Sequence, residues 1–326
     1  MFLSKQRQGI LGIGVLTAVI LAAPAQAAET GKKIKVLTTV APITNIVLNV
    51  AGLHVDLHGL IPEGSDSHTF EPVPSDVKYV AQADLIIVNG LHLETPTMHL
   101  TEANKKKTAV VVKLADQTIS RKEWVFDFSF PEDKGDPNPH LWLNVAHGMK
   151  YAELVREALV KVDPANKSAY DANAADYLAK LKQLDEAIMA TMKTIPEKNR
   201  KLVTYHDSWA YFCPRYGCKV IGAVQPSDFA QPTPQDMVAL IKQLRAEAVP
   251  AIFGSEVFPS KVLDQIGREA KVKFVDTLRD DDLPGEIDAV EHTYVGMMKE
   301  NVETMARVLG GDASALKVID PANVGN

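Results

Sequence analysis

Three histidines and one aspartate, at the ends of predicted strands or in loops beyond them, are the residues of this sequence that could do chemistry. His68 and His140 lie in loops that contain prolines, while His206 and Asp276 close two apolar, strand-like segments. Ligands collect at the carboxyl ends of strands in open α/β sheets, so these four positions are the first candidates for a site.

The types of these four residues point to metal chemistry. Three imidazoles and one carboxylate form a closed first-row metal site whose nitrogen and oxygen ligands suit Zn²⁺ and are tolerable for Mn²⁺ or Fe²⁺. Successive members are 66 to 72 positions apart, which excludes a local finger-type site and favours one assembled between lobes. A single histidine at a strand end is more often an ordinary polar residue, so spacing alone does not select this set.

Two series of alternating strands and helices surround the candidates. Runs rich in Val, Ile and Leu predict four strands in each half of the chain, at 34–39, 54–61, 84–89, 109–114, 201–206, 219–224, 251–255 and 272–277. Between the halves, residues 164–194 contain no glycine and no internal proline, and apolar residues recur there at helical spacing. The fold class predicted is α/β, with two lobes, each a largely parallel sheet flanked by helices, joined by one long helix.

The amino terminus reads as an export signal. Basic residues precede the apolar stretch 10–23, and Ala25-Gln26-Ala27 has the form that signal peptidase accepts, so cleavage is expected after Ala27. The expected domains are residues 1–27 as signal peptide, 28–163 as the first lobe, 164–195 as the linking helix and 196–326 as the second lobe. No cysteine follows the apolar stretch closely, so a periplasmic protein without a lipid anchor is expected.

Composition narrows the classes of partner. The chain has 326 residues, of which 46% are hydrophobic and 23% charged, as in soluble globular proteins. A formal net charge of −6 gives no overall basic field to attract nucleic acid. A monomer is the default expectation for the exported chain.

Three motifs resemble the zinc and manganese ABC-transporter solute-binding proteins of the periplasm (the zinc-uptake type of cluster nine, or cluster A-I). They are Ser67 to Pro72, Asn138 to Leu143, and Tyr205 to Phe212 ahead of Tyr216-Gly217. The resemblance extends over nearly all of the chain that follows the signal peptide. It implies two pseudo-symmetric lobes, joined by one long rigid helix, and one divalent transition metal in the cleft. The four ligand positions fall on His68, His140, His206 and Asp276.

The same resemblance implies a role and a metal. Members capture the metal and deliver it to an inner-membrane ABC permease that a cytoplasmic ATPase drives. Zinc-binding members commonly carry His at the third ligand position, where manganese and iron binders carry Glu, and this chain has His206. The histidine-rich loop of many Gram-negative zinc members is absent from 129–138. Zinc is therefore predicted first, with manganese or iron as the alternative.

Several carboxylates near the candidates have more than one interpretation. Glu71 either orients a ligand or accepts hydrogen bonds within its own loop. Asp207 either fixes an imidazole tautomer or caps a helix beginning at Ser208. Glu256 is a candidate oxygen ligand or hydrogen-bond acceptor in the cleft. The run of aspartates at 280–282 is interpreted as a solvated loop with at most weak attraction for metal.

Cys213 and Cys218 flank the end of a predicted helix, where an oxidising compartment allows a local disulfide.

Two further functions compete with metal transport as interpretations of the sequence. A zinc hydrolase needs an open coordination position, which Asp276 would close, and the sequence lacks both a His-Glu-x-x-His helix and a Gly-x-Ser-x-Gly elbow. An adhesin, as some relatives have been named, is disfavoured if the chain is not anchored to a surface.

Overall fold

Two four-stranded parallel sheets form the framework of the protein. The computed structural model describes residues 1, 32–227, 229–257 and 261–324, without the side chains at 276 and 277. Within this part, the first sheet has the strand order β2-β1-β3-β4 and the second β6-β5-β7-β8, so the two sheets share one topology. The strands are β1 Ile34–Thr38, β2 Val55–Gly59, β3 Leu85–Val88, β4 Val110–Lys113, β5 Lys201–Thr204, β6 Lys219–Ala223, β7 Ala251–Ser255 and β8 Lys273–Leu278.

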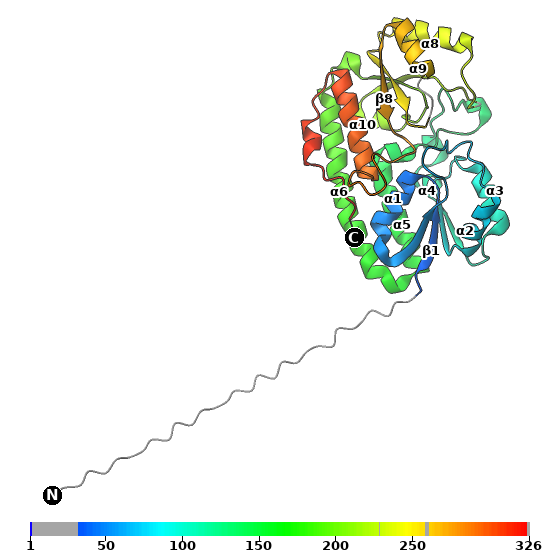
Figure 1. The fold of residues 1–326 in the computed structure, drawn as a ribbon, viewed down its shortest axis with the longest axis vertical. Helices are drawn as coiled ribbons and strands as arrows, with labels where there is room; N and C mark the ends of the chain where they lie inside the picture. The colour runs from blue at the N-terminus through cyan, green and yellow to red at the C-terminus, as the bar shows by residue number, and fades with distance from the viewer. Residues whose placement is uncertain (2–31, 228, 258–260, 325–326) are drawn as a thin grey trace. The chain divides into compact units, whose positions relative to one another are not determined.

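Helices flank both sheets, which confirms the predicted fold class (Figure 1). The first sheet has α1 Ala41–Ala51, α2 Val77–Gln82, α3 Thr95–Asn104, α4 Leu114–Thr118 and α5 Val145–Val162. The second has α7 Phe212–Tyr216, α8 Pro234–Ala246, α9 Lys261–Ala270 and α10 Tyr294–Leu309. Each predicted strand is present within one or two residues of its expected bounds. The apolar runs form strands that the core covers on both faces: every residue of β3 and of β7 is buried.

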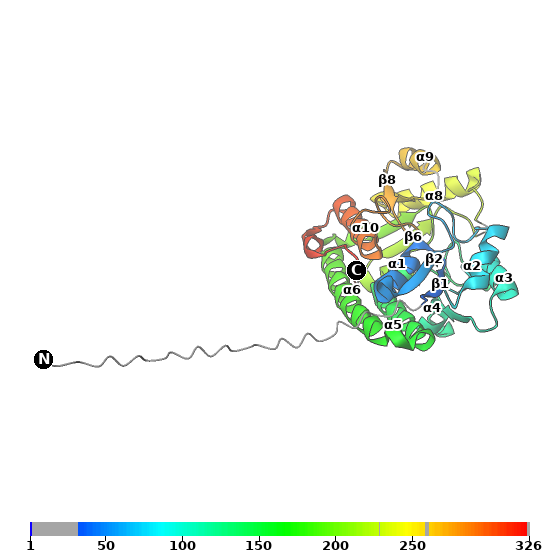
Figure 2. The same cartoon turned by 60° about the horizontal axis from the view of Figure 1, so that its bottom comes forward.

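A long helix links the two halves, as the sequence predicts. Helix α6 covers Lys167–Thr194 and follows a single 3₁₀ turn at Pro164–Asn166. Its 28 residues span about 42 Å. It packs against α1 and α5 of the first lobe and against α7 and α10 of the second. Figures 1 and 2 show α6 and α10 side by side along this edge.

Further contacts tie the two lobes together. Tyr294 at the start of α10 donates its backbone N–H to Asn45 of α1 and its hydroxyl to the carbonyl of Trp142. Asn323, beyond α10, accepts hydrogen bonds from the side-chain amides of Asn45 and Asn49. A large rotation of one lobe would break these buried contacts, so we expect motion on metal binding to be concentrated in the loops.

Residues 33–326 form one compact unit that excludes residues 1–32. The expected signal peptide lies almost wholly outside the described residues, and the boundaries drawn at 27, 163 and 195 remain predictions. No helix in the described part of the chain is long and apolar enough to cross a membrane.

Candidate metal centre

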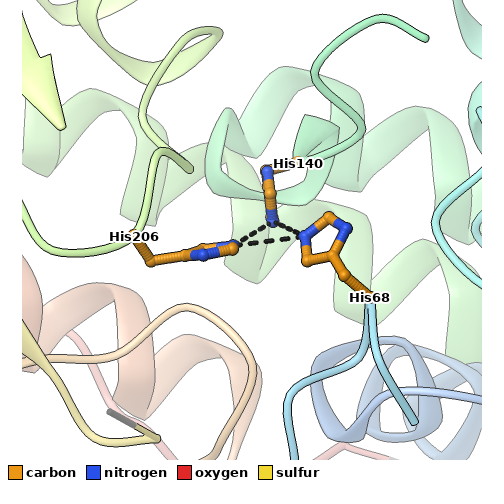
Figure 3. A group of neighbouring side chains, drawn as sticks. All are labelled: His68, His140 and His206. Carbon is orange, nitrogen blue, oxygen red and sulfur yellow. Dashed lines mark hydrogen bonds between the residues drawn. The ribbon is translucent and has the colours of Figure 1, made fainter. Parts of the chain in front are cut away.

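Three of the four predicted ligands converge on one point between the lobes. The Nε2 atoms of His140 and His206 lie 2.9 Å apart, and that of His68 lies 3.2 Å from His140 and 3.3 Å from His206. Figure 3 shows the three rings pointing toward one another from three separate loops. His206 follows the end of β5, His68 lies in the loop after β2, and His140 precedes α5. Together they form a group able to hold a metal ion.

Neutral amide side chains orient two of these rings. Gln225 places its Oε1 2.6 Å from His206 Nδ1, and Asn138 places its Oδ1 2.8 Å from His140 Nδ1. A carbonyl oxygen only accepts hydrogen bonds, so each Nδ1 carries the proton and each Nε2 presents its lone pair to the centre. The Asn138 amide also donates to the carbonyl of Asp207, which joins the His140 loop to the His206 loop.

The surroundings favour the neutral imidazole at His68 and at His140. His140 and His206 are buried, and the ring of His68 stacks on Phe229 with 4.6 Å between centroids. Burial, together with the neighbouring histidine rings, holds the pKa of His68 and the pKa of His140 well below the usual value. Neutral imidazole is the form that binds metal. A cavity of about 350 Å³, lined by His68 and Phe130 among others, opens from this cluster.

A carboxylate also approaches the three histidines, and it comes from the run of aspartates at 280–282 that the sequence predicts to lie in solvent. Asp280 is buried, and its Oδ2 lies 4.0 Å from His206 Nε2. Its Oδ1 accepts a hydrogen bond from Ser255, and its backbone carbonyl accepts one from the indole of Trp142. Burial, and next the charge of Asp281, raise the pKa of Asp280 to about 8. The interpretation of 280–282 as a solvated loop is therefore wrong.

The predicted fourth ligand, Asp276, belongs to β8, but its side chain lies outside the described residues. The register of β8 against β7 shifts between Phe253 and Ser255, and the strand continues to Leu278, beyond its predicted end. The crevice at the carboxyl end of β8 therefore begins after Leu278, which is where Asp280 stands.

The other carboxylates singled out from the sequence have different outcomes. Glu71 is exposed. Asp207 is buried and accepts a hydrogen bond from the backbone N–H of Ser129, while Gln225 and not Asp207 holds the His206 ring. The helix expected from Ser208 begins only at Phe212, so Asp207 caps no helix. Beside it, burial and the neighbouring carboxylate of Asp207 raise the pKa of Asp127 to about 9.

Glu256 follows β7, and one of its oxygens contacts backbone N–H groups rather than a histidine. Its Oε1 accepts hydrogen bonds from the N–H groups of Asp280, Asp281 and Asp282 at 3.0, 3.1 and 2.9 Å. Nothing in the sequence signals this contact, because 24 to 26 positions separate the partners.

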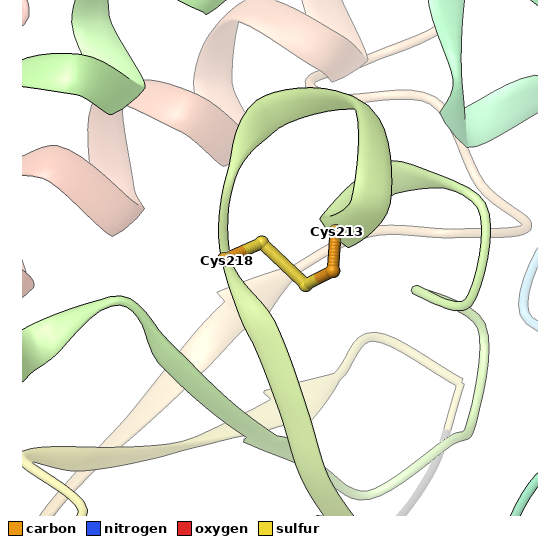
Figure 4. Close-up of a disulfide and its surroundings, with 2 residues drawn as sticks. All are labelled: Cys213 and Cys218. Atoms are coloured by element: carbon orange, nitrogen blue, oxygen red, sulfur yellow. A yellow bond between two sulfur atoms is a disulfide. The ribbon is translucent and has the colours of Figure 1, made fainter. Parts of the chain in front are cut away.

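The predicted disulfide is present. Cys213 in α7 is bonded to Cys218, just before β6 (Figure 4). The bond closes the turn that leads from the His206 segment back into the second sheet.

Known proteins share both the sequence pattern and the fold. A family model described as the periplasmic component A of the zinc-uptake complex matches residues 36–308. The manganese ABC transporter substrate-binding lipoprotein PsaA of Streptococcus anginosus is 31% identical over 92% of this chain and 97% of its own length. The metal ABC transporter substrate-binding lipoprotein FimA of Streptococcus parasanguinis is 29% identical over 92% of this chain and 96% of its own.

A solved structure supports the same assignment. The periplasmic zinc-binding protein TroA of Treponema pallidum has a TM-score of 0.77 and 28% identity, covering 85% of this chain and 99% of its own. The curated relatives are named lipoproteins, and this naming contradicts the expectation of a protein without a lipid anchor, which is withdrawn. These relatives are substrate-binding proteins and not enzymes, which rules out the zinc hydrolase as an interpretation of the sequence. The chain belongs to the zinc-uptake component A family of metal-binding, exported ABC-transporter substrate-binding proteins.

Proposed function

We propose that this protein binds one Zn²⁺ ion through His68, His140, His206 and Asp280. The observation that carries the proposal is the spacing of the three Nε2 atoms, 2.9 to 3.3 Å. Zn–N bonds of about 2.0–2.1 Å in a tetrahedral site place two ligand nitrogens about 3.3 Å apart. The rings therefore need little movement to enclose a zinc ion, and the Asp280 carboxylate supplies the oxygen on the remaining side.

The donor set favours zinc over manganese. Three imidazole nitrogens and one carboxylate are softer than the oxygen-rich sets that suit manganese, and intrinsic affinity rises from manganese toward zinc. Manganese is the second candidate, because a 31% identical relative is named a manganese protein and a structural neighbour from Candidatus Liberibacter asiaticus is Mn-bound. Its TM-score is 0.73 at 26% identity over 84% of this chain and all of its own.

In the proposed role, the exported chain, cleaved near Ala27, works as a monomer. It hands the metal to an inner-membrane ABC permease powered by a cytoplasmic ATPase. The family membership supports the transport role. The neutral imidazoles and the burial of the site support capture of metal from a dilute pool.

The test is metal content by mass spectrometry after equimolar competition between Zn²⁺ and Mn²⁺. One zinc per chain is expected, together with its loss in Asp280→Asn. Asp276→Asn is the matched variant, since it makes the same change four positions earlier in the chain. Retention of manganese against zinc would make the protein a manganese receptor. Loss of metal in Asp276→Asn but not in Asp280→Asn would reassign the fourth ligand.

A further inference from the structure

Three consecutive aspartates in the loop after β8 are buried together. Asp280, Asp281 and Asp282 are only 3%, 5% and 8% exposed. Burying adjacent carboxylates costs free energy unless hydrogen bonds compensate for the lost water. In the backbone of this loop, one oxygen of Glu256, which follows β7, accepts the N–H groups of all three residues.

In this loop conformation, the side chains of Asp280 and Asp281 lie next to different residues. Asp280 directs its Oδ2 toward His206 Nε2. Asp281 accepts the hydroxyl of Ser67 at 2.7 Å, and Ser67 is the residue before His68.

The third side chain makes a second contact with the same loop of the first lobe. Asp282 accepts the backbone N–H of Gly64 at 2.7 Å. The loop that supplies the proposed oxygen ligand therefore also holds the loop that supplies His68. The two loops belong to different lobes and contact one another through these aspartates.

We propose that Glu256 is a positioning residue that couples the fourth ligand to closure of the His68 loop. The ligand half of this inference rests on the proposed function, whereas the contacts with Gly64 and Ser67 do not. With Glu256 in place, Asp280, Asp281 and Asp282 occupy their positions as a unit. Without it, the three N–H groups lose their shared acceptor, so both the metal ligand and the contacts that hold the His68 loop loosen together.

The first test is hydrogen exchange of the metal-free protein. In Glu256→Ala, the amides of Gly64 and Ser67 should exchange faster, although Glu256 contacts neither residue. Glu256→Gln keeps an oxygen acceptor and should restore slow exchange. Asp84→Ala is the control: its carboxylate also accepts a backbone N–H, that of Lys35, but at the start of β3 and away from the acidic loop. Unchanged exchange at 64 and 67 in Glu256→Ala would overturn the coupling.

The second test is metal affinity. Supporting residues behind metal ligands are commonly worth about 10- to 100-fold in affinity, and Glu256→Ala should lose that much while Glu256→Gln loses little. Ser67→Ala should weaken metal binding less in the Glu256→Ala background than in the wild type, because Asp281 is already misplaced there. Losses that simply add would refute the coupling. If the wild type bound no metal, the proposed function would fail, and the exchange experiment would still decide the coupling of the loops.

Discussion

Replacement of Gln225 by leucine tests how the protein prepares His206 for metal. The Gln225 Oε1 lies 2.6 Å from His206 Nδ1, and both residues are buried, at 2% and 1% exposure. Leucine keeps most of the volume and removes the acceptor. In the metal-free protein the imidazole proton can move from Nδ1 to Nε2, so little stability should be lost. In the metal-bound protein Nε2 is occupied, so the proton must stay on Nδ1 without a partner.

The difference between the metal-free and the metal-bound protein sets how much metal affinity Gln225→Leu should lose. A buried donor without an acceptor costs about 1–3 kcal/mol, which corresponds to about a 5- to 150-fold weaker dissociation constant if the whole cost falls on the metal-bound state. Competition with a chromophoric chelator measures the affinity, and thermal unfolding of the metal-free protein measures the stability. Gln225→Glu, which retains an acceptor, should bind metal more tightly than Gln225→Leu. An unchanged affinity in Gln225→Leu, or an equal loss in both variants, would refute the argument about the imidazole proton.

Three further predictions concern stability. Reduction of Cys213–Cys218, whose partners are five positions apart, should lower the free energy of unfolding by about 2 kcal/mol and leave metal affinity nearly unchanged, as chemical denaturation with and without reductant will show. Gly148→Ala should cost about 1–3 kcal/mol in the same assay, since its Cβ would lie 2.6 Å from the Tyr294 hydroxyl oxygen; a neutral result would mean that α5 and α10 adjust freely. Because the folded protein raises the pKa of Asp127 to about 9, its contribution is complete below about pH 4 and is lost as pH rises toward about 9. The melting temperature of Asp127→Asn should therefore depend less on pH across that window than that of the wild type, and equal pH dependence would contradict the assignment.

The strands and helices of the fold were predictable because the sequence patterns that indicate them lie within each element. The apolar run that becomes β3 and the uninterrupted helical pattern of α6 fix those elements without knowledge of their partners. His68 and His206 were recognisable because each follows a predicted strand, and parallel strands bring their carboxyl ends to one edge. His140 stood out because it lies in a proline-containing loop before a helix.

The missed features depend on contacts that are distant in the sequence. A run of three aspartates usually faces solvent. Burial of 280–282 depends on distant partners, among them the acceptor on Glu256 and the donors of Ser67 and Gly64. Gln225 carried no signal at all, because a neutral amide at a strand end has many common roles. The sequence favours Asp276 because this residue closes the predicted strand, whereas Asp280 belongs to a run of aspartates that is typical of solvated loops.

The most direct test of the account is a crystal structure of the zinc-loaded protein with anomalous data collected at the zinc edge. We predict one ion, with the Nε2 atoms of His68, His140 and His206 and one oxygen of Asp280 each within about 2.0–2.2 Å. An ion held without one of the three histidines, or with the Asp280 carboxylate turned away from it, would contradict the assigned site.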